Sequence, residues 1–289
     1  MTTRRDFIKQ SSLLSAAFLV NSNDFFKTQK RIGVQLYTLR NDLSKNSRAV
    51  LEQVAALGYL DVETFGYNKG KWFGMTATEF AAELKKNGLK SPSGHTFPGG
   101  MFLKDGWEED WKKAVDDSKT LGQEYIVIPW LEEPHRKSID NYKKIAEGLN
   151  KAAGMAKEVG LKFAYHNHDF EFANIDGQTG FDILMNGTDP KLVGMELDIY
   201  WAVRAGKDPV ELFKANPGRF PLWHIKDMDK TEKKFFTEVG NGVIDFKTIF
   251  ASAKKAGMKH FYVEQDQCPG APIDSIKKSI EYMKANLIK

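Results

Sequence analysis

The sequence predicts a (β/α)8 barrel, also called a TIM barrel, and three observations support this prediction. From Ile32 onward, short apolar runs with strand character alternate with longer segments of helical period, as expected for a parallel sheet with crossover helices. Eight such apolar runs are present, and eight strands close this type of barrel. The length of 289 residues accommodates one barrel of about 250 residues and a short leader.

The elements follow one another in a regular order along the chain. The predicted strands are Ile32 to Thr38, Leu60 to Phe65, Leu89 to His95, Tyr125 to Trp130, Lys162 to His168, Gly194 to Tyr200, Pro221 to Lys226 and His260 to Gln265. Amphipathic segments predicted as helices lie between them, among them Ser47 to Leu57, Thr78 to Asn87, Trp107 to Leu121 and Ser138 to Val159. A glycine precedes several strands, at positions 58, 88, 122, 160 and 257, where it can supply the left-handed cap that ends a helix.

We divide the chain into a leader, residues 1–28, and one barrel domain, residues 29–289. The leader contains Arg4-Arg5-Asp6-Phe7-Ile8-Lys9 followed by the apolar stretch Leu13 to Val20, which is the order of a signal peptide. Its paired arginines resemble a twin-arginine export signal, so we expect an exported, periplasmic protein. An ordinary amphipathic first helix is the alternative, and cleavage of the leader stays open.

The charge distribution argues against nucleic acid or a membrane surface as the partner. Residues 1–30 hold five Lys and Arg against two Asp, a net charge of +3 out of the total of +4. The barrel is therefore nearly neutral and lacks the basic footprint of a DNA-binding protein. The apolar part of the leader is too short to span a bilayer, which takes about 20 residues, and no stable membrane anchor is expected.

The single cysteine offers little chemistry. Cys268 is alone in the sequence, so neither an intramolecular disulfide nor a cysteine-rich zinc site is available. Because it lies in a Gln-Cys-Pro-Gly turn, we do not assign it as a nucleophile.

Imidazoles and carboxylates emerge at the ends of the last four predicted strands. The strands end in Tyr165-His166-Asn167-His168, Glu196-Leu197-Asp198, His224-Ile225-Lys226 and Val263-Glu264-Gln265-Asp266. The carboxyl ends of the strands form the functional face of a barrel, and burying such groups is expensive unless they are paired or bind a metal. Since alternate residues share a face, one divalent metal could be bound by His166, Asp198, His224 and Glu264.

Two imidazoles and two carboxylates suit Mn²⁺, Co²⁺, Fe²⁺ or Zn²⁺, and Mg²⁺ stays among the candidates. For any one of these residues alone, an ordinary buried polar contact is the better interpretation. Four of them at equivalent positions of consecutive strands favour the metal site.

The strand-end motifs resemble those of the sugar phosphate isomerase/epimerase family, whose members have a xylose isomerase-like barrel. The resemblance rests on Gly33-Val34-Gln35-Leu36-Tyr37, Tyr165-His166-Asn167-His168, Leu197-Asp198, His224-Ile225-Lys226-Asp227 and Val263-Glu264, and it covers nearly everything after the leader. The family includes inosose dehydratases, hydroxypyruvate isomerases and ketose 3-epimerases. Its metal ligands are generally Glu, Asp, His and Glu on strands five to eight. By this resemblance Asp198, His224 and Glu264 match the last three, whereas His166 replaces the first Glu.

The resemblance implies proton chemistry on a small carbohydrate. A bound metal would stabilise an enediolate, Glu264 would be the base, His166 or His168 its imidazole partner, and Lys226 a cation for the developing oxyanion. Ketose 3-epimerases use both Glu ligands as acid/bases on opposite faces of the substrate. Here only Glu264 remains of that pair.

Other polar and aromatic residues at the barrel mouth could contact substrate. Glu63 and His95 end strands two and three, and Trp130 and Trp201 follow strands four and six, where an indole can stack on a sugar ring. A structural role is an equally good interpretation for each. Glu171 could reach the metal from its loop, and Gly240-Asn241-Gly242 lies where barrels often bind phosphate, although we interpret it as a turn. The Trp72-Phe73 pair could cap a neighbouring subunit in a homo-oligomer.

Four functions remain open. Isomerisation or epimerisation of a free sugar or keto-sugar is the first expectation, and metal-dependent elimination or hydration of a 3-keto-glycoside or related keto-sugar is the second. A DNA-repair endonuclease of the same superfamily needs more histidine ligands than the six in this sequence, and Trp201 stands where those enzymes have a further His. A non-catalytic periplasmic sugar-binding barrel is the remaining alternative.

Overall fold

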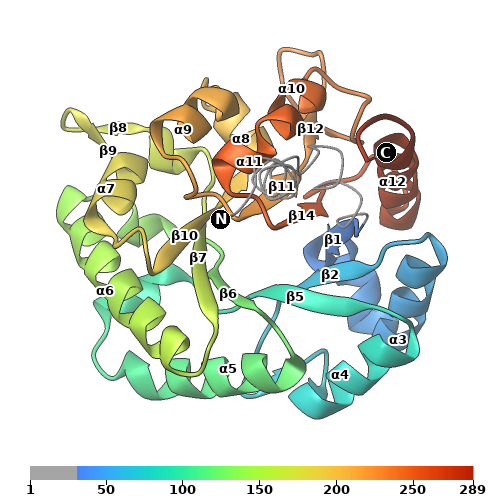
Figure 1. Ribbon diagram of the computed structural model, residues 1–289, viewed down its shortest axis with the longest axis horizontal. Coiled ribbons are helices and arrows are strands. Elements are labelled where there is room, and N and C mark those ends of the chain that lie inside the picture. The colour runs from blue at the N-terminus through green and yellow to red at the C-terminus, as the bar shows by residue number, and fades with distance from the viewer. Residues whose placement is uncertain (1–30, 289) are drawn as a thin grey trace, which may run out of the picture.

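A computed structural model describes residues 31–288. Eight parallel strands form a closed barrel in the order β1-β14-β11-β10-β7-β6-β5-β2, so strands adjacent in the chain are neighbours around the barrel. Helices surround it on the outside (Figure 1). The barrel strands are β1 (Gly33–Gln35), β2 (Asp61–Thr64), β5 (Lys90–His95), β6 (Tyr125–Ile128), β7 (Lys162–His166), β10 (Val193–Asp198), β11 (Leu222–Ile225) and β14 (His260–Val263). The predicted fold is confirmed.

The remaining elements are the outer helices and short additions at the barrel mouth. The helices are α3 (Arg40–Ala56), α4 (Ala77–Lys86), α5 (Trp107–Leu121), α6 (Ile139–Glu158), α7 (Gly180–Gly187), α8 (Ile199–Arg204), α9 (Pro209–Ala215), α10 (Phe246–Ala251), α11 (Ala253–Ala256) and α12 (Pro272–Asn286). Short 3-10 helices are η1 (Leu36–Leu39), η2 (Gly99–Leu103), η3 (Glu133–His135) and η4 (Phe170–Phe172). Three small antiparallel pairs join β3 (Lys71–Trp72) to β4 (Met75–Thr76), β8 (Asn174–Ile175) to β9 (Gln178–Thr179), and β12 (Asp227–Met228) to β13 (Phe236–Thr237).

Seven of the eight predicted strands end one to three residues earlier than predicted, and the first and sixth show a reason. The first ends at Gln35, whose side chain caps η1 by accepting a hydrogen bond from the Tyr37 amide. The sixth ends at Asp198, which caps α8 by accepting from the Trp201 amide. An apolar run therefore gives the position of a strand, whereas a polar cap inside the run decides where the strand stops.

The helix predictions hold with small shifts. Trp107 to Leu121 coincides with α5, and Gly122 caps that helix at a φ of 92°. The largest shift is at α3, which begins at Arg40 instead of Ser47 and contains a non-helical residue, Asn46.

An apolar plug fills the lower part of the barrel. Val127, Leu222 and Tyr262 are fully buried there, with Tyr125 and Ala164 in the same cluster. A larger core lies between the strands and the surrounding helices. Above the plug, toward the carboxyl ends of the strands, the inward side chains become polar, and this change positions the functional site.

The structure contradicts one expectation about the periphery. Trp72 is fully buried against Tyr67 and Phe80 of its own chain, so the expectation of an exposed Trp72-Phe73 cap is wrong for this residue. No helix between residues 31 and 288 is long and apolar enough to cross a membrane. The predicted leader lies outside the described residues.

Candidate active site and metal centre

The deepest polar layer of the barrel is built around Glu63. Strand register aligns Gln35 with Glu63 and Glu63 with Ser93. Gln35 Nε2 donates to Glu63 Oε2 at 2.8 Å, and Ser93 Oγ donates to Glu63 Oε1 at 2.5 Å. All three side chains are completely buried. Both oxygens of this carboxylate are thus held by neighbouring strands.

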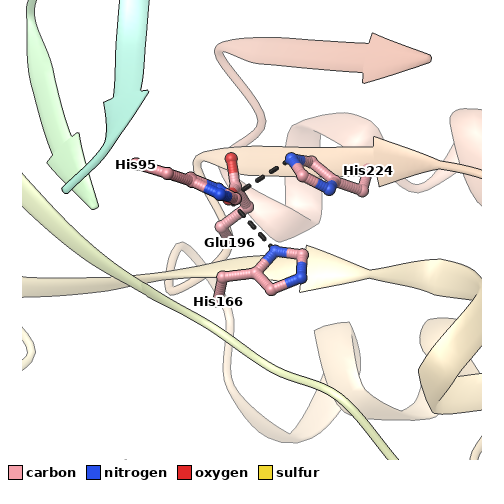
Figure 2. Close-up of side chains that lie close together, drawn as sticks. All are labelled: His95, His166, Glu196 and His224. Atoms are coloured by element: carbon pink, nitrogen blue, oxygen red, sulfur yellow. Dashed lines mark hydrogen bonds and ion pairs between the residues drawn. The ribbon is translucent and has the colours of Figure 1, made fainter. Parts of the chain in front are cut away.

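A second group, the histidine cluster, consists of His95, His166, Glu196 and His224. Its imidazoles come from β5, β7 and β11 and point toward the Glu196 carboxylate (Figure 2). Glu196 Oε2 lies 2.7 Å from His95 Nε2, 3.1 Å from His166 Nδ1 and 3.4 Å from His224 Nε2. Three imidazoles therefore converge on one carboxylate oxygen at the barrel axis.

A third group, the carboxylate cluster, consists of Asp198, Glu264 and Asp266 around Lys226. The Lys226 ammonium lies 2.9 Å from Asp198 Oδ2, 2.7 Å from Glu264 Oε2 and 2.5 Å from Asp266 Oδ2. Lys226 is 1% exposed. A buried ammonium needs such partners, because an unpaired charge in the interior is very costly.

His224 joins the three groups. Its Nε2 lies 2.6 Å from Glu63 Oε2, and its Nδ1 lies 2.8 Å from Glu264 Oε2 and 3.9 Å from Asp198 Oδ2. Burial disfavours a charged imidazole, but the surrounding carboxylates outweigh burial and raise the His224 pKa well above its ordinary value. The His224 ring therefore contacts both Glu63 in the deep polar layer and Glu264 in the carboxylate cluster.

The pKa values of the two candidate bases at the cavity are both lowered, which leaves one group charged and the other neutral. Burial would raise the pKa of Glu264, but Lys226 and His224 lower it well below the ordinary value, so this carboxylate is ionised. Burial lowers the pKa of His168 to about 3, and Lys226 adds to the effect, so this imidazole is neutral. Burial raises the pKa of Asp198 to about 6.

A cavity of about 450 Å³ lies over these groups. Its lining includes five of the residues predicted for the site together with small and aromatic neighbours: Tyr37, Phe65, Gly66, His95, Thr96, Pro129, Trp130, His166, His168, Glu264 and Asp266. Trp130 is 41% exposed and Tyr37 is 39% exposed, so two aromatic rings are accessible there. The volume suits a small sugar-like ligand.

The other predicted residues lie below or beside this cavity. Glu63, Asp198, His224 and Lys226 are at most 1% exposed and are not among its lining residues. Trp201 packs beside His168, with ring centroids 5.6 Å apart.

Glu171, considered as a ligand that could reach the metal, is held away from the clusters. Its carboxylate accepts hydrogen bonds from the Tyr165 hydroxyl at 2.6 Å and from the His168 amide at 2.7 Å. Glu171 therefore fixes the loop that carries His168.

Glu196 and Asp266 are site residues that the predicted set omits. Each lies two positions from a predicted ligand, Asp198 or Glu264, and therefore on the same face of the chain. The sequence contained the signal, but alternation alone does not say which of two acidic residues on one face is the ligand.

The donor atoms fit a divalent cation. Donors of His95, His166, Glu196 and His224 lie within 4.8 Å of one another, as do those of Asp198, His224 and Glu264. The predicted four-ligand set is thus divided between two overlapping groups that share His224, and His166 Nε2 lies 3.7 Å from Asp198 Oδ2. Within residues 31–288, Glu196 Oε1 is a buried oxygen without a hydrogen bond, and Asp198 Oδ2 has no hydrogen bond besides its ion pair with Lys226. Imidazole and carboxylate donors with unused lone pairs suit Mn²⁺, Co²⁺, Fe²⁺ or Zn²⁺.

The Gly240-Asn241-Gly242 segment forms a turn around Asp227, as expected. The Asp227 carboxylate accepts hydrogen bonds from the amides of Gly240, Gly242 and Ile244 at 2.9–3.1 Å. A carboxylate of the chain itself therefore uses the amides that a phosphate would need.

Inosose dehydratases are among the known proteins to which this chain is similar in sequence. An inosose dehydratase from Geobacillus kaustophilus is 27% identical over 274 residues, which are 81% of this chain and 85% of that protein. Inosose dehydratase from Lacticaseibacillus casei aligns over only 55% of its own length.

Two solved structures extend these comparisons. A sugar phosphate isomerase/epimerase from Parabacteroides distasonis has a TM-score of 0.79 and 29% identity, and the match covers 90% of this chain and 96% of that one. The fold of an IolI protein with a zinc atom is also similar, with a TM-score of 0.67, 18% identity and coverage of 88% and 95%.

A family model described as xylose isomerase-like TIM barrel matches residues 51–286. That span contains most of the barrel and all the clustered acidic, basic and histidine residues of the site. The resemblance seen in the strand-end motifs is thereby confirmed, and the chain belongs to the xylose isomerase-like TIM barrel family.

Proposed function

We propose that this protein is a divalent-metal-dependent lyase acting on an unphosphorylated, sugar-like ketone. It would remove a proton from the carbon beside the keto group and expel water or an alcohol from the next carbon. The observation that carries this proposal is the position of Glu264, an ionised carboxylate that lines the cavity and also contacts His224 and Lys226.

The placement of the carboxylates favours elimination over epimerisation. Glu264 and Asp266 are the carboxylates among the lining residues within 31–288, and both follow β14. An epimerase that works through two carboxylates needs them on opposite faces of the substrate. Elimination can proceed with a base and an acid on one side. Similarity to an inosose dehydratase over 81% of the chain supports the same choice.

The chain's own residues divide the work as follows. Asp198, His224 and Glu264 would hold the cation, which supplies Lewis-acid polarisation of a carbonyl when bound. Glu264 accepts the carbon-bound proton and, once protonated, can pass it to the leaving oxygen on the same side, while Asp266 stays paired with Lys226. Lys226 holds both carboxylates in place through contacts of 2.5–2.7 Å. His168, on the loop after β7 three strands away around the barrel, binds a substrate hydroxyl as a neutral imidazole.

An unphosphorylated substrate follows from the surroundings of the cavity. None of the lining residues within 31–288 is an arginine or lysine, and Asp227 already uses the amides of the Gly240 turn. Trp130 and Tyr37 instead offer aromatic faces on which a sugar ring can stack. A periplasmic location, which the predicted leader implies, would also suit a neutral glycoside.

Isomerisation is the second candidate, supported by the sugar phosphate isomerase/epimerase from Parabacteroides distasonis. Both reactions begin with removal of a proton from the carbon beside the ketone. The lyase then expels water or an alcohol, whereas the isomerase returns a proton to carbon. Incubating the Mn²⁺-loaded protein in D₂O with an inosose, a 3-keto-glucoside and a free ketose separates them by NMR. Release of water or aglycone supports the lyase, whereas deuterium entering a ketose without elimination supports the isomerase.

Two controls complete this experiment. Glu264→Gln should lose turnover by at least about 100-fold, as expected for a missing general base. A Glu264→Gln protein that turns over at the wild-type rate would contradict the proposal, and binding without turnover by wild type would indicate a non-catalytic sugar-binding barrel. Metal analysis of wild type beside His224→Ala should show metal only in the former.

A further inference from the structure

Glu63 holds His224 from the side opposite the cavity. Glu63 Oε2 lies 2.6 Å from His224 Nε2, and both side chains are fully buried. The distance from Glu196 Oε2 to the same nitrogen is 3.4 Å. Glu63 is therefore the nearest hydrogen-bond acceptor for the Nε2 proton.

The hydrogen bonds behind Glu63 fix its carboxylate. Ser93 Oγ donates to one oxygen at 2.5 Å, and Gln35 Nε2 donates to the other at 2.8 Å. The Gln35 amide is itself oriented, because its Oε1 accepts a hydrogen bond from the Tyr37 backbone amide at 3.0 Å. A directed chain thus runs from a backbone amide through Gln35 to Glu63, and Glu63 accepts from His224.

This chain determines what the other nitrogen of His224 can do. A cation can bind only a ring nitrogen that has given up its proton, and with one proton held on Nε2 by Glu63 the nitrogen that can provide a lone pair is Nδ1. Nδ1 faces Glu264 Oε2 at 2.8 Å and Asp198 Oδ2 at 3.9 Å. Metal-binding histidines commonly donate their second N–H to a carboxylate, which fixes the ring and increases the basicity of the metal-binding nitrogen.

Binding through Nε2 would be the alternative, with His95, His166 and Glu196 as the other ligands. It would require His224 to give up Glu63, leaving a fully buried carboxylate without its partner at 2.6 Å. His95 and His166 on that side and Glu264 on the Nδ1 side all line the cavity, so the contact between Glu63 and Nε2 is the observation that separates the two sides.

We propose that Glu63 is a positioning residue that directs the metal to the Nδ1 side of His224, between Asp198 and Glu264. This inference rests on the proposed metal-dependent function. It gives Glu63 a role below the cavity instead of a direct contact with substrate.

The first test measures metal affinity. Glu63→Gln keeps the shape but removes the charge, so we expect Mn²⁺ to bind about 10-fold more weakly by isothermal titration. Glu63→Met also removes the acceptor and should approach a 100-fold loss, the upper part of the range for such partners. Glu83→Gln is the matched control, because Glu83 is buried on α4 and pairs with Arg48 and Lys86. Its affinity should equal that of wild type.

The second test uses wild type alone and does not depend on the folding of a variant. In Zn²⁺-loaded protein with ¹⁵N-labelled histidine, the His224 resonances should show a protonated Nε2 and a metal-bound Nδ1. A metal-bound Nε2 would overturn the inference.

The remaining outcomes are also decisive. Equal Mn²⁺ affinities in wild type and both Glu63 variants, with lower melting temperatures in the variants, would reduce Glu63 to a structural role. Loss of metal in Glu196→Gln but not in Asp198→Asn would place the cation in the histidine cluster and refute both the inference and the ligand assignment, whereas metal-dependent elimination with Glu264 as the base would still stand. If wild type bound no metal, both the proposed function and this inference would fall.

Discussion

Replacing Lys226 by methionine should destabilise the metal-free protein far more than removal of an exposed lysine. At an effective dielectric constant of about 20, each of its three contacts at 2.5–2.9 Å is worth roughly 6 kcal/mol before solvation is counted. Desolvation and repulsion among the carboxylates offset most of that sum. Removing one partner of a buried ion pair costs about 3–5 kcal/mol in practice, and we expect a loss in this range for Lys226→Met.

This loss should appear in thermal unfolding and depend on pH. For a domain of this size, about 3–5 kcal/mol corresponds to a decrease in Tm of roughly 6–20 °C. Without the ammonium, the pKa of Asp198, already about 6, should rise further. A carboxyl group whose pKa is higher in the folded than in the unfolded protein lowers the free energy of unfolding as pH rises between those two pKa values. The deficit of Lys226→Met should therefore be largest near pH 8 and shrink toward pH 5.

Lys214→Met is the matched control for this measurement. Its ammonium lies 2.7 Å from Glu211, the same distance as from Lys226 to Glu264, but Lys214 and Glu211 are 56% and 65% exposed. An exposed pair contributes little to stability because water screens it, so Lys214→Met should leave the Tm nearly unchanged. Equal Tm losses in the two variants, or a Lys226→Met deficit that grows as pH falls, would refute the argument.

Three further predictions concern the cavity, a buried acid and the leader. Trp130→Ala should raise KM for a sugar substrate about 5- to 10-fold, in line with an aromatic contact worth about 1 kcal/mol; Phe235→Ala, equally exposed but away from the cavity, should not, and steady-state kinetics on both variants checks this. Burial raises the pKa of Glu171 from 4.5 to about 7, so wild type should lose about 3 kcal/mol of stability between pH 4.5 and 7 through this group. Urea unfolding of Glu171→Gln should lack that part of the slope, and identical slopes would contradict the assignment. Changing Arg4 and Arg5 to lysine should retain the protein in the cytoplasm, and unchanged periplasmic recovery after fractionation would exclude twin-arginine export.

The barrel could be predicted because its signals are local and repeated. Each strand is an apolar run, and the glycines after several helices adopt the positive φ that a helix cap needs, as at Gly122 and Gly257. The predicted ends of the strands were less accurate than their predicted positions. At Gln35 and Asp198 a side chain caps the following helix, and the apolar residues beyond the cap belong to that helix.

The candidate site was predictable in its residues but not in their grouping. Alternation along a strand identifies the inward face, and in the structure His166, Asp198, His224 and Glu264 lie together at one end of the barrel. It does not give the direction of each side chain. His166 Nδ1 faces Glu196 at 3.1 Å, so the structure associates His166 with the histidine cluster, while Asp198 and Glu264 surround Lys226.

Depth along the barrel axis separates roles that the sequence cannot distinguish. Glu63 and Glu264 are both glutamates near strand ends, and both contact the His224 ring, at Nε2 and Nδ1 respectively. Glu63 is fully enclosed by Ser93, Gln35 and the ring, whereas Glu264 remains 5% exposed and lines the cavity. Only a carboxylate at the cavity can take a proton from substrate, while one held on every side can only orient its neighbour. Glu264, at Nδ1 of His224, can therefore take a proton from substrate, whereas Glu63, at Nε2, orients the imidazole ring.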